Sequence, residues 1–248
     1  MDAPADLDAL NALGAADLAA ILAGPAAARV ALIRAAADAG VAEAQAVLAQ
    51  MLLDGRDLPA DPPAAFRLFA TAARAGHLVA INMVGRCYDL GWGTPVDKTL
   101  AAQWYRAAAE RGLDWGMYNY GTLLALGDGV PLDRALALAW FGRAADMGNA
   151  KAANFVGSFH EDGWVVSRDL GEAARCYRIA AEGGDFRGQF NHARMRVGAG
   201  DIAGALPWLE RAAAGGNARF RAQAALWLIA TDQPALVDAA ALFRDGAG

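Results

Sequence analysis

The residues of this chain that are best suited to catalysis or metal binding are its three histidines, His77, His160 and His192. Glu161 and Asp162 follow His160 directly, and a repeat in the sequence places His160 and His192 in neighbouring copies. His160, Glu161 and His192 are therefore a candidate metal or hydrolytic site. A zinc site takes three or four ligands, and two histidines without a neighbouring thiolate motif fit that poorly. We favour the alternative, in which His160 and His192 are partly buried polar residues between copies, and we expect His77 to be exposed to solvent.

The sequence carries no other pattern typical of an enzyme. It contains no nucleophile elbow, no P-loop and no dinucleotide-binding fingerprint. The stretch GDGVPLD at 127–133 resembles a calcium loop but lacks the series of oxygen ligands that such a loop needs. We therefore predict a protein that is not an enzyme and has no catalytic, cofactor-binding or metal-binding residues.

Charge and composition exclude further classes. The 248 residues carry a formal net charge of −5, which argues against non-specific binding to nucleic acid. No apolar run reaches the length of roughly 18 residues expected of a membrane span, and the acidic start lacks the basic segment of a signal peptide. Cys87 and Cys176 fall at different positions of different repeats, so no disulfide framework is indicated. We expect a cytoplasmic protein with neither nucleic-acid nor membrane partners.

One amphipathic phrase recurs along the chain at a spacing of 36 residues. It reads AAQWYRAAAERG at 101–112, ALAWFGRAADMG at 137–148 and AARCYRIAAEGG at 173–184. The phrase ends on a glycine, and an aspartate precedes that glycine at a constant distance in every copy. A fixed period of this length is typical of stacked repeats. The glycines are Gly40, Gly76, Gly112, Gly148, Gly184 and, after a shorter interval, Gly216; the aspartates are Asp61, Asp97, Asp133, Asp169 and Asp201.

Each copy of the repeat predicts two helices, helix A after the glycine and helix B after the aspartate. The aspartate can accept hydrogen bonds from free backbone N–H groups as an N-cap, and the glycine supplies the left-handed conformation that ends a helix. A glycine inside helix A costs roughly 1 kcal/mol relative to alanine, so its recurrence indicates close packing. These glycines are Gly85, Gly121 and Gly157, and the helix B tryptophans that we predict to lie in the core are Trp104, Trp140 and Trp208.

These positions resemble the Sel1-like repeat family, a relative of the tetratricopeptide repeat. The second copy shows the family pattern nearly in full, from Gly85 and Tyr88 through the loop Gly91–Asp97 to Trp104 and Tyr105. The resemblance implies an all-α fold, a right-handed α-solenoid of antiparallel helix pairs with helix A on the concave side, and an adaptor without catalytic activity. We predict one solenoid domain over residues 1–248: an N-terminal cap and half repeat at 1–40, copies at 41–76, 77–112, 113–148, 149–184 and 185–216, and a C-terminal cap at 217–248.

By analogy with tetratricopeptide arrays, certain positions of helix A face the concave groove. These positions vary from copy to copy, which suits a surface adapted to a partner; the alternative is that they are merely solvated. Aromatic residues would anchor a partner, asparagines would bond an extended peptide backbone, and basic residues would pair with carboxylates. The predicted groove residues are Asn82, Arg86, Trp115, Tyr118, Lys151, Asn154, Arg187, Phe190 and Arg194; Trp92 and Trp164 are rim residues that either contact a partner or pack on the next loop.

We therefore expect an adaptor or scaffold protein that binds an acidic or C-terminal protein segment in this groove. The alternative is a regulatory or substrate-recruiting module that works with a separate enzyme. No cofactor is expected in either case.

Overall fold

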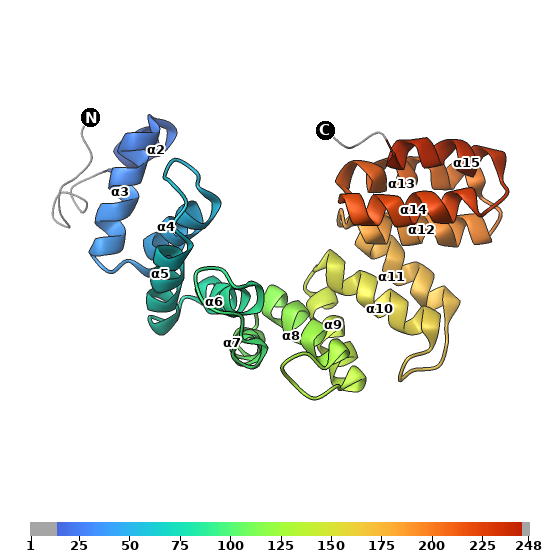
Figure 1. The fold of residues 1–248 in the computed structure, drawn as a ribbon, viewed down its shortest axis with the longest axis horizontal. Coiled ribbons are helices and arrows are strands. Elements are labelled where there is room, and N and C mark those ends of the chain that lie inside the picture. Colours follow the sequence, from blue (N-terminus) through green and yellow to red (C-terminus); the bar gives the residue numbers. More distant parts are fainter. Residues whose placement is uncertain (1–13, 245–248) are drawn as a thin grey trace. The chain divides into compact units, whose positions relative to one another are not determined.

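The computed structural model describes residues 14–244, and every regular element among them is a helix (Figure 1). The chain divides into two compact units. Unit 1, which ends at Leu132, contains α2 (Ala15–Ala23), α3 (Ala26–Asp38), α4 (Ala42–Asp54), α5 (Pro62–Arg74), α6 (Leu78–Leu90), α7 (Lys98–Glu110) and α8 (Asp114–Leu126). Unit 2 contains α9 (Arg134–Asp146), α10 (Ala150–Asp162), α11 (Leu170–Glu182), α12 (Phe186–Gly198), α13 (Ile202–Gly215), α14 (Ala218–Ile229), α15 (Pro234–Ala239) and the 3-10 helix η1 (Ala240–Phe243).

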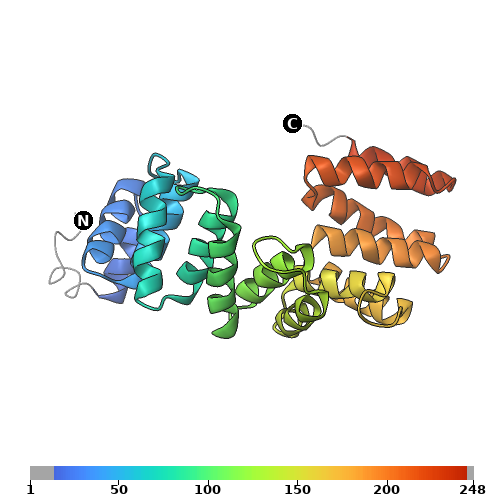
Figure 2. The same cartoon turned by 60° about the horizontal axis from the view of Figure 1, so that its bottom comes forward.

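Consecutive helices pack against one another within each unit. In unit 1 every helix from α2 to α8 contacts the next, and Figure 2 shows these helices side by side in chain order. In unit 2 the same holds from α9 to α13. The predicted all-α fold of stacked helix pairs is thereby confirmed, with α4, α6, α8, α10 and α12 as helix A of successive copies.

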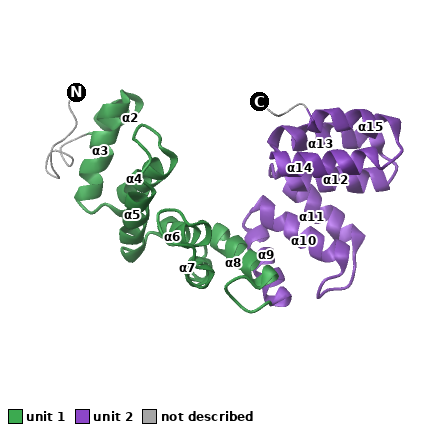
Figure 3. Cartoon of the chain, in the orientation of Figure 1, with its two compact units in different colours: residues 1–132 green, residues 133–248 purple. Residues whose placement is uncertain are grey.

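The chain divides into two compact units, the first ending at Leu132 and the second beginning at Asp133 (Figure 3). This boundary falls inside the third predicted copy, between its helix A and its helix B. The single domain over 1–248 stays a prediction, and each unit is described by itself below.

The aspartates and glycines of the repeat set the helix ends. Helices α3 to α12 are each 13 residues long. At the start of each helix B, the aspartate side chain accepts a hydrogen bond of 2.8–2.9 Å from a backbone N–H three residues on. Gly40, Gly76, Gly112, Gly148 and Gly184 have φ between 86° and 91°, as predicted. Gly216 differs, because its φ is −78° and its backbone is extended.

The core of each copy lies one residue beyond the predicted tryptophans. Trp104, Trp140 and Trp208 are only half-buried, so the expectation that they form the core is corrected. Successive residues of a helix point about 100° apart, so a large side chain at the first of the two positions lies at the edge of the core; only the small Cys176 is buried there together with its neighbour Tyr177. The buried residues at the next position are Phe69, Tyr105, Phe141, Tyr177 and Leu209.

The glycines inside helix A give the tyrosine rings of helix B room to pack. A Cβ added at Gly85 would lie 2.7 Å from Cδ1 of Tyr105, and one at Gly157 would lie 2.6 Å from Cε1 of Tyr177. Both distances are far below ordinary van der Waals contact. The predicted close packing at this position is confirmed for these two copies.

The loops between helix A and helix B have a second left-handed residue two positions after the left-handed glycine that ends helix A. It is Gly93 or Gly129 in two copies, each with φ of 72°, but Asp57 and Val165 in two others, with φ of 61° and 54°. A Cβ at Gly93 would lie 2.0 Å from the carbonyl oxygen of Pro62, so this loop lies directly on the start of the preceding helix B. A β-branched residue such as Val165 is strained in this conformation.

The region predicted as a C-terminal cap contains a shortened sixth helix pair. α14 takes the place of helix A, and α15 with η1 takes the place of helix B. Leu236 and Phe243 are buried with Leu209 and Leu228 in the core of unit 2. The sequence did not reveal this pair, because the residues after Asp232 lack the pair of large apolar residues and the following pair of alanines at the spacing seen in the other copies.

We predict opposite effects for two glycine-to-alanine substitutions in unit 2. Gly157→Ala should lower the melting temperature, because the added methyl overpacks against the buried Tyr177 ring at a cost of about 1–3 kcal/mol. Gly142→Ala is the matched control, since no atom lies within 4 Å of the position its Cβ would take in α9. It should raise stability by about 1 kcal/mol through helix propensity alone. Thermal melts followed by circular dichroism measure both, and stabilisation by Gly157→Ala would contradict the packing described here.

Candidate functional site

Two of the predicted groove residues lie instead in contacts between successive A helices. Asn82 and Asn154 are only 5% and 6% exposed. The side-chain oxygen of Asn82 accepts a hydrogen bond of 2.9 Å from Nδ2 of Asn119, and that of Asn154 accepts one of 2.8 Å from Nδ2 of Asn191. This corrects the expectation that they face an open groove. The partners Asn119 and Asn191 were missed, although each stands at the same interval after its asparagine, and that shared spacing could have revealed them.

Phe190 occupies the same repeat position and is also a packing residue. The centre of its ring lies 5.5 Å from that of Trp227 and 6.1 Å from that of Phe243. Trp227 follows Phe190 at the same interval in the sequence as Asn119 follows Asn82. The predicted aromatic anchor is thus part of the core of unit 2, because the sixth helix pair covers it.

The basic residues predicted in unit 2 differ in their surroundings. Arg194 pairs with Glu161 at 2.8 Å, and Glu161 also accepts a hydrogen bond of 2.6 Å from the hydroxyl of Tyr177. Arg187 is exposed, with its guanidinium 4.6 Å from the centre of the Phe186 ring. Lys151 is half-buried. Burial raises the pKa of Asp185, and the hydrogen bond from the Gly188 N–H and the charges of Arg187 and Lys151 oppose that shift. The carboxylate partner of Arg194 is therefore internal.

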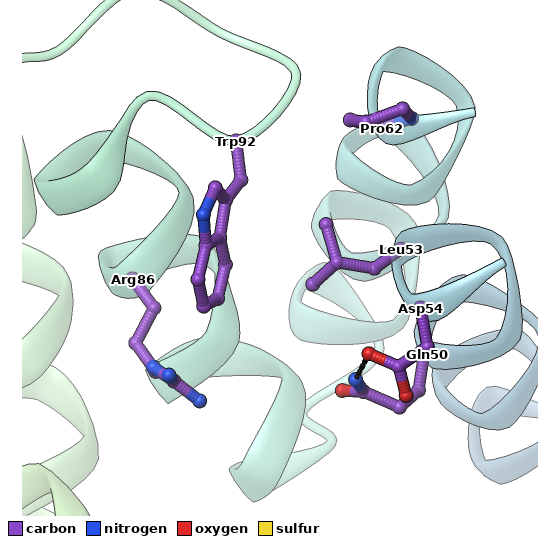
Figure 4. A pocket seen from close by; sticks show the side chains of 6 residues that line it. All are labelled: Gln50, Leu53, Asp54, Pro62, Arg86 and Trp92. Carbon is purple, nitrogen blue, oxygen red and sulfur yellow. Dashed lines mark hydrogen bonds between the residues drawn. The ribbon is translucent and has the colours of Figure 1, made fainter. Parts of the chain in front are cut away.

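In unit 1, the structure brings the predicted groove residue Arg86 and the rim residue Trp92 together in one pocket. The pocket has a volume of about 370 Å³ and lies between α4 and α6. The Arg86 guanidinium carbon lies 4.6 Å from the centre of the Trp92 ring, within the range of a cation–π contact. Figure 4 shows these two on one wall, opposite the remaining lining residues. The full lining of this α4–α6 pocket is Gln50, Leu53, Asp54, Pro62, Arg86 and Trp92.

Within the α4–α6 pocket, Arg86 keeps hydrogen-bond donors for a ligand. Its Nη1 contacts the sulfur of Met83 at 3.8 Å, a weak acceptor. Within residues 14–244 it forms no ion pair with a carboxylate. On the opposite wall, Nε2 of Gln50 donates a hydrogen bond of 2.8 Å to Oδ1 of Asp54.

The remaining predicted aromatic residues lie outside this pocket. The side chain of Trp115 is 45% exposed and meets the half-buried Tyr118 edge to face, with 5.9 Å between ring centres. Trp164 is 40% exposed in its loop, where its ring contacts Phe159 and lies 5.0 Å from the guanidinium of Arg134. Trp164 thus packs within unit 2 and still presents apolar surface.

The histidines do not form a metal site. Among residues 14–244 no group of three or more histidine, cysteine, aspartate or glutamate side chains could hold a metal ion. His192 is 9% exposed and packs edge to face on Trp208, with 5.1 Å between ring centres. His77 is half-buried rather than exposed: its Nδ1 accepts from the N–H of Ala80 at 3.1 Å, and its Nε2 lies 2.7 Å from Oε2 of Glu43. That histidine is an N-cap of α6.

The two cysteines are buried thiols of low reactivity. Burial raises the pKa of Cys87 to about 11, and it raises the pKa of Cys176 to about 11 as well. A thiol with such a pKa is almost fully protonated at neutral pH and is a poor nucleophile.

Stacked pairs of short helices at a fixed period define a helical repeat protein, and comparison with family models identifies the repeat family. The model of the Sel1 repeat matches residues 42–77, 78–113, 116–149, 150–185 and 196–217. Because these segments cover more than half of the chain, the protein belongs to the Sel1 repeat family. Proteins of this family generally mediate protein–protein interactions and are typically non-catalytic scaffolds. No curated protein matches the chain significantly.

Solved structures show the same architecture. A Sel1 repeat protein from Oxalobacter formigenes is 26% identical, with a TM-score of 0.77 over 90% of this chain and 95% of that one. The protein c5321, a protective antigen present in uropathogenic Escherichia coli strains, is 25% identical with a TM-score of 0.68; the match covers 88% of this chain but only 48% of that one. The immunity protein Pa5087 from Pseudomonas aeruginosa, at 18% identity and a TM-score of 0.55, shares the fold alone. In the described part of this chain, no helix has the length and apolar character needed to span a bilayer.

We predict that His192 makes unit 2 sensitive to acid. Burial, aided by the charge of Arg196, lowers the pKa of His192 below its ordinary value of 6.5. Above pH 6.5 the ring is neutral whether the chain is folded or unfolded, so its contribution to stability is fully present. As the pH falls below 6.5 the unfolded chain takes up the proton first, and this contribution to stability is lost. Melting temperatures at about pH 7.5 and 5.5 should therefore differ more in the natural protein than in His192→Gln. An unchanged difference in the variant would assign the acid sensitivity to other groups.

Proposed function

We propose that this protein is an adaptor that binds a segment of a partner protein on the helix A side of unit 1, with a carboxylate of that segment on Arg86. The observation that carries the proposal is the position of the Arg86 guanidinium, stacked over Trp92 in the α4–α6 pocket and without a carboxylate partner in the described chain. The segment is acidic or ends in a free C-terminus.

The chemistry of this pair suits recognition of a carboxylate. A guanidinium is planar, stays charged at all physiological pH values and can bind both oxygens of a carboxylate at once. Stacking on Trp92 holds the guanidinium in place, which reduces the entropy that it loses when a ligand binds. Tryptophan and arginine are also the residue types most enriched among those that dominate the energy of protein interfaces.

The exposed aromatic surface of unit 1 supports a segment longer than one residue. Trp115 in α8 and Val79 at the start of α6 are 45% and 51% exposed, and they share a repeat position on the two A helices that follow α4. Contiguous exposed apolar surface is typical of a surface that a partner covers, and we propose that Val79 and Trp115 contribute to one such surface.

We predict that Arg86→Gln weakens the binding of carboxylate-bearing peptides by about ten- to a hundredfold. A hydrogen bond to a charged group contributes about 1.5–3 kcal/mol, which corresponds to that loss. The full chain is first screened against short synthetic peptides that are acidic, basic or neutral, with free or amidated C-termini, and the affinities of those that bind are then measured by fluorescence anisotropy. Selection of acidic or free C-terminal peptides is the expected result.

Arg211→Gln is the matched control for this experiment. Arg211 also stacks on a tryptophan, at 4.7 Å from the ring centre of Trp208, but on α13 in unit 2. Its replacement should leave peptide affinity unchanged. The proposal is rejected if the peptides selected carry no carboxylate, or if Arg86→Gln and Arg211→Gln have the same effect.

A further inference from the structure

We infer that the α4–α6 pocket accepts the last residue of a partner chain that ends in an aliphatic side chain such as leucine. The α-carboxylate would lie on Arg86, the side chain against Trp92 and Leu53, and the backbone N–H of the same residue would donate to Asp54. This inference rests on the proposed function and narrows it from acidic or C-terminal segments to one kind of C-terminus.

The lining of the pocket separates into an apolar part and a polar part. Trp92, Leu53 and Pro62 supply apolar surface, and Arg86, Gln50 and Asp54 supply hydrogen-bonding groups. In Figure 4, Trp92 lies above Arg86 on one wall and Pro62 and Leu53 lie above Gln50 on the other, so both walls change from apolar to polar in the same direction. A ligand that fits must be apolar at one end and polar at the other.

The two charged groups of the pocket do not neutralise each other. Arg86 and Asp54 stand on opposite walls and, within the described chain, form no ion pair with each other. Arg86 offers hydrogen-bond donors, and Asp54, which already accepts from Gln50, can accept a further hydrogen bond; both groups face the same space. The terminal residue of a chain carries a carboxylate, an N–H and a side chain on one Cα, which matches this set of groups.

The second unit shows what happens when a carboxylate fills the equivalent place. Arg86 and Arg194 are separated by a whole number of repeat periods, and so are Leu53 and Glu161, so each pair holds the same position of the repeat. Nη2 of Arg194 lies 2.8 Å and 3.1 Å from the two carboxylate oxygens of Glu161. In the α4–α6 pocket Leu53 replaces the glutamate. The arginine therefore keeps a position suited to a carboxylate, and that carboxylate must come from a ligand.

The next copy of unit 1 closes the equivalent space in a different way. The positions of Leu53, Pro62 and Trp92 are taken there by Asp89, Lys98 and Asp128, each one repeat period further along the chain. Lys98 bonds to Asp89 and lies 3.3 Å from Asp128, so these ionic groups satisfy one another. The apolar wall is specific to the α4–α6 pocket.

The size of the pocket favours one terminal residue over a longer internal segment. Its volume of about 370 Å³ is close to the lower limit of roughly 300 Å³ for small-ligand pockets. An internal aspartate or glutamate would bring its carboxylate to Arg86 but would have no aliphatic group for the wall formed by Trp92 and Leu53. A chain that ends in leucine supplies both groups.

The test compares peptides that differ only at their last residue. Fluorescein-labelled peptides of neutral sequence end in leucine with a free carboxylate, in leucine amide, or in lysine with a free carboxylate; a fourth is acidic inside and amidated. The full chain should bind the first peptide about tenfold or more tightly than the leucine amide, and Arg86→Gln should abolish that difference. The lysine peptide should bind several-fold more weakly than the leucine peptide.

Leu53→Glu tests the comparison with unit 2 directly. The new carboxylate should pair with Arg86 as Glu161 pairs with Arg194, and it should weaken binding of the free leucine peptide by about tenfold or more. Leu53→Gln is the matched control, because glutamine nearly reproduces the shape of glutamate without its charge; it should lose only the part of the affinity that the aliphatic contact supplies, and so bind the peptide more tightly than Leu53→Glu. Circular dichroism and melting temperature show whether both variants fold.

Each outcome separates this inference from the proposed function. Equal binding of the free and amidated leucine peptides overturns the inference. If the acidic amidated peptide binds and the leucine peptide does not, the inference is overturned and the proposed function stands. If no carboxylate-bearing peptide binds, both are wrong. Equal affinity in Leu53→Glu and Leu53→Gln overturns the assignment of Arg86 as the carboxylate receptor.

Discussion

The structure depends on one constraint: its helices are too short to be stable alone. Helices of 13 residues are marginal in water, because the cost of forming the first turn is spread over few hydrogen bonds. Stability must come from contact with neighbouring helices, and in this chain that contact is close. Gly85 and Gly157 let a tyrosine ring from helix B lie against the backbone of helix A. The same contact fixes which faces of helix A remain available to a partner.

Repetition makes positions equivalent, so a small change in one copy stands out against the others. Arg86 and Arg194 occupy the same repeat position, yet Arg194 is paired internally and, within the described chain, Arg86 is not. The difference comes from Leu53 in place of the glutamate found at position 161. Identical scaffolding therefore produces a satisfied ion pair in unit 2 and a pocket with an available guanidinium in unit 1.

Much of the fold could be predicted from the sequence, because glycine and aspartate act locally and return at a fixed spacing. The directions of individual side chains could not be predicted from the sequence. Neighbouring helix residues point about 100° apart. Trp104, which was expected in the core, therefore lies beside it, and Tyr105 lies within it. Analogy with tetratricopeptide arrays predicts Asn82 in the groove, and it does not reveal the contact with Asn119, which joins positions one residue further apart than the repeat. The pocket was beyond prediction, since it depends on the loop conformation that brings Trp92 over Arg86.

The most direct test of this account measures the helicity of a single copy of the repeat. The segment 77–112 contains α6 and α7 with their own caps but without neighbouring copies. Circular dichroism of this peptide should show a largely unfolded chain with no cooperative melting, whereas the full protein should melt cooperatively. A stable, fully helical peptide would show that each helix pair holds itself together, and the dependence on neighbours would be wrong.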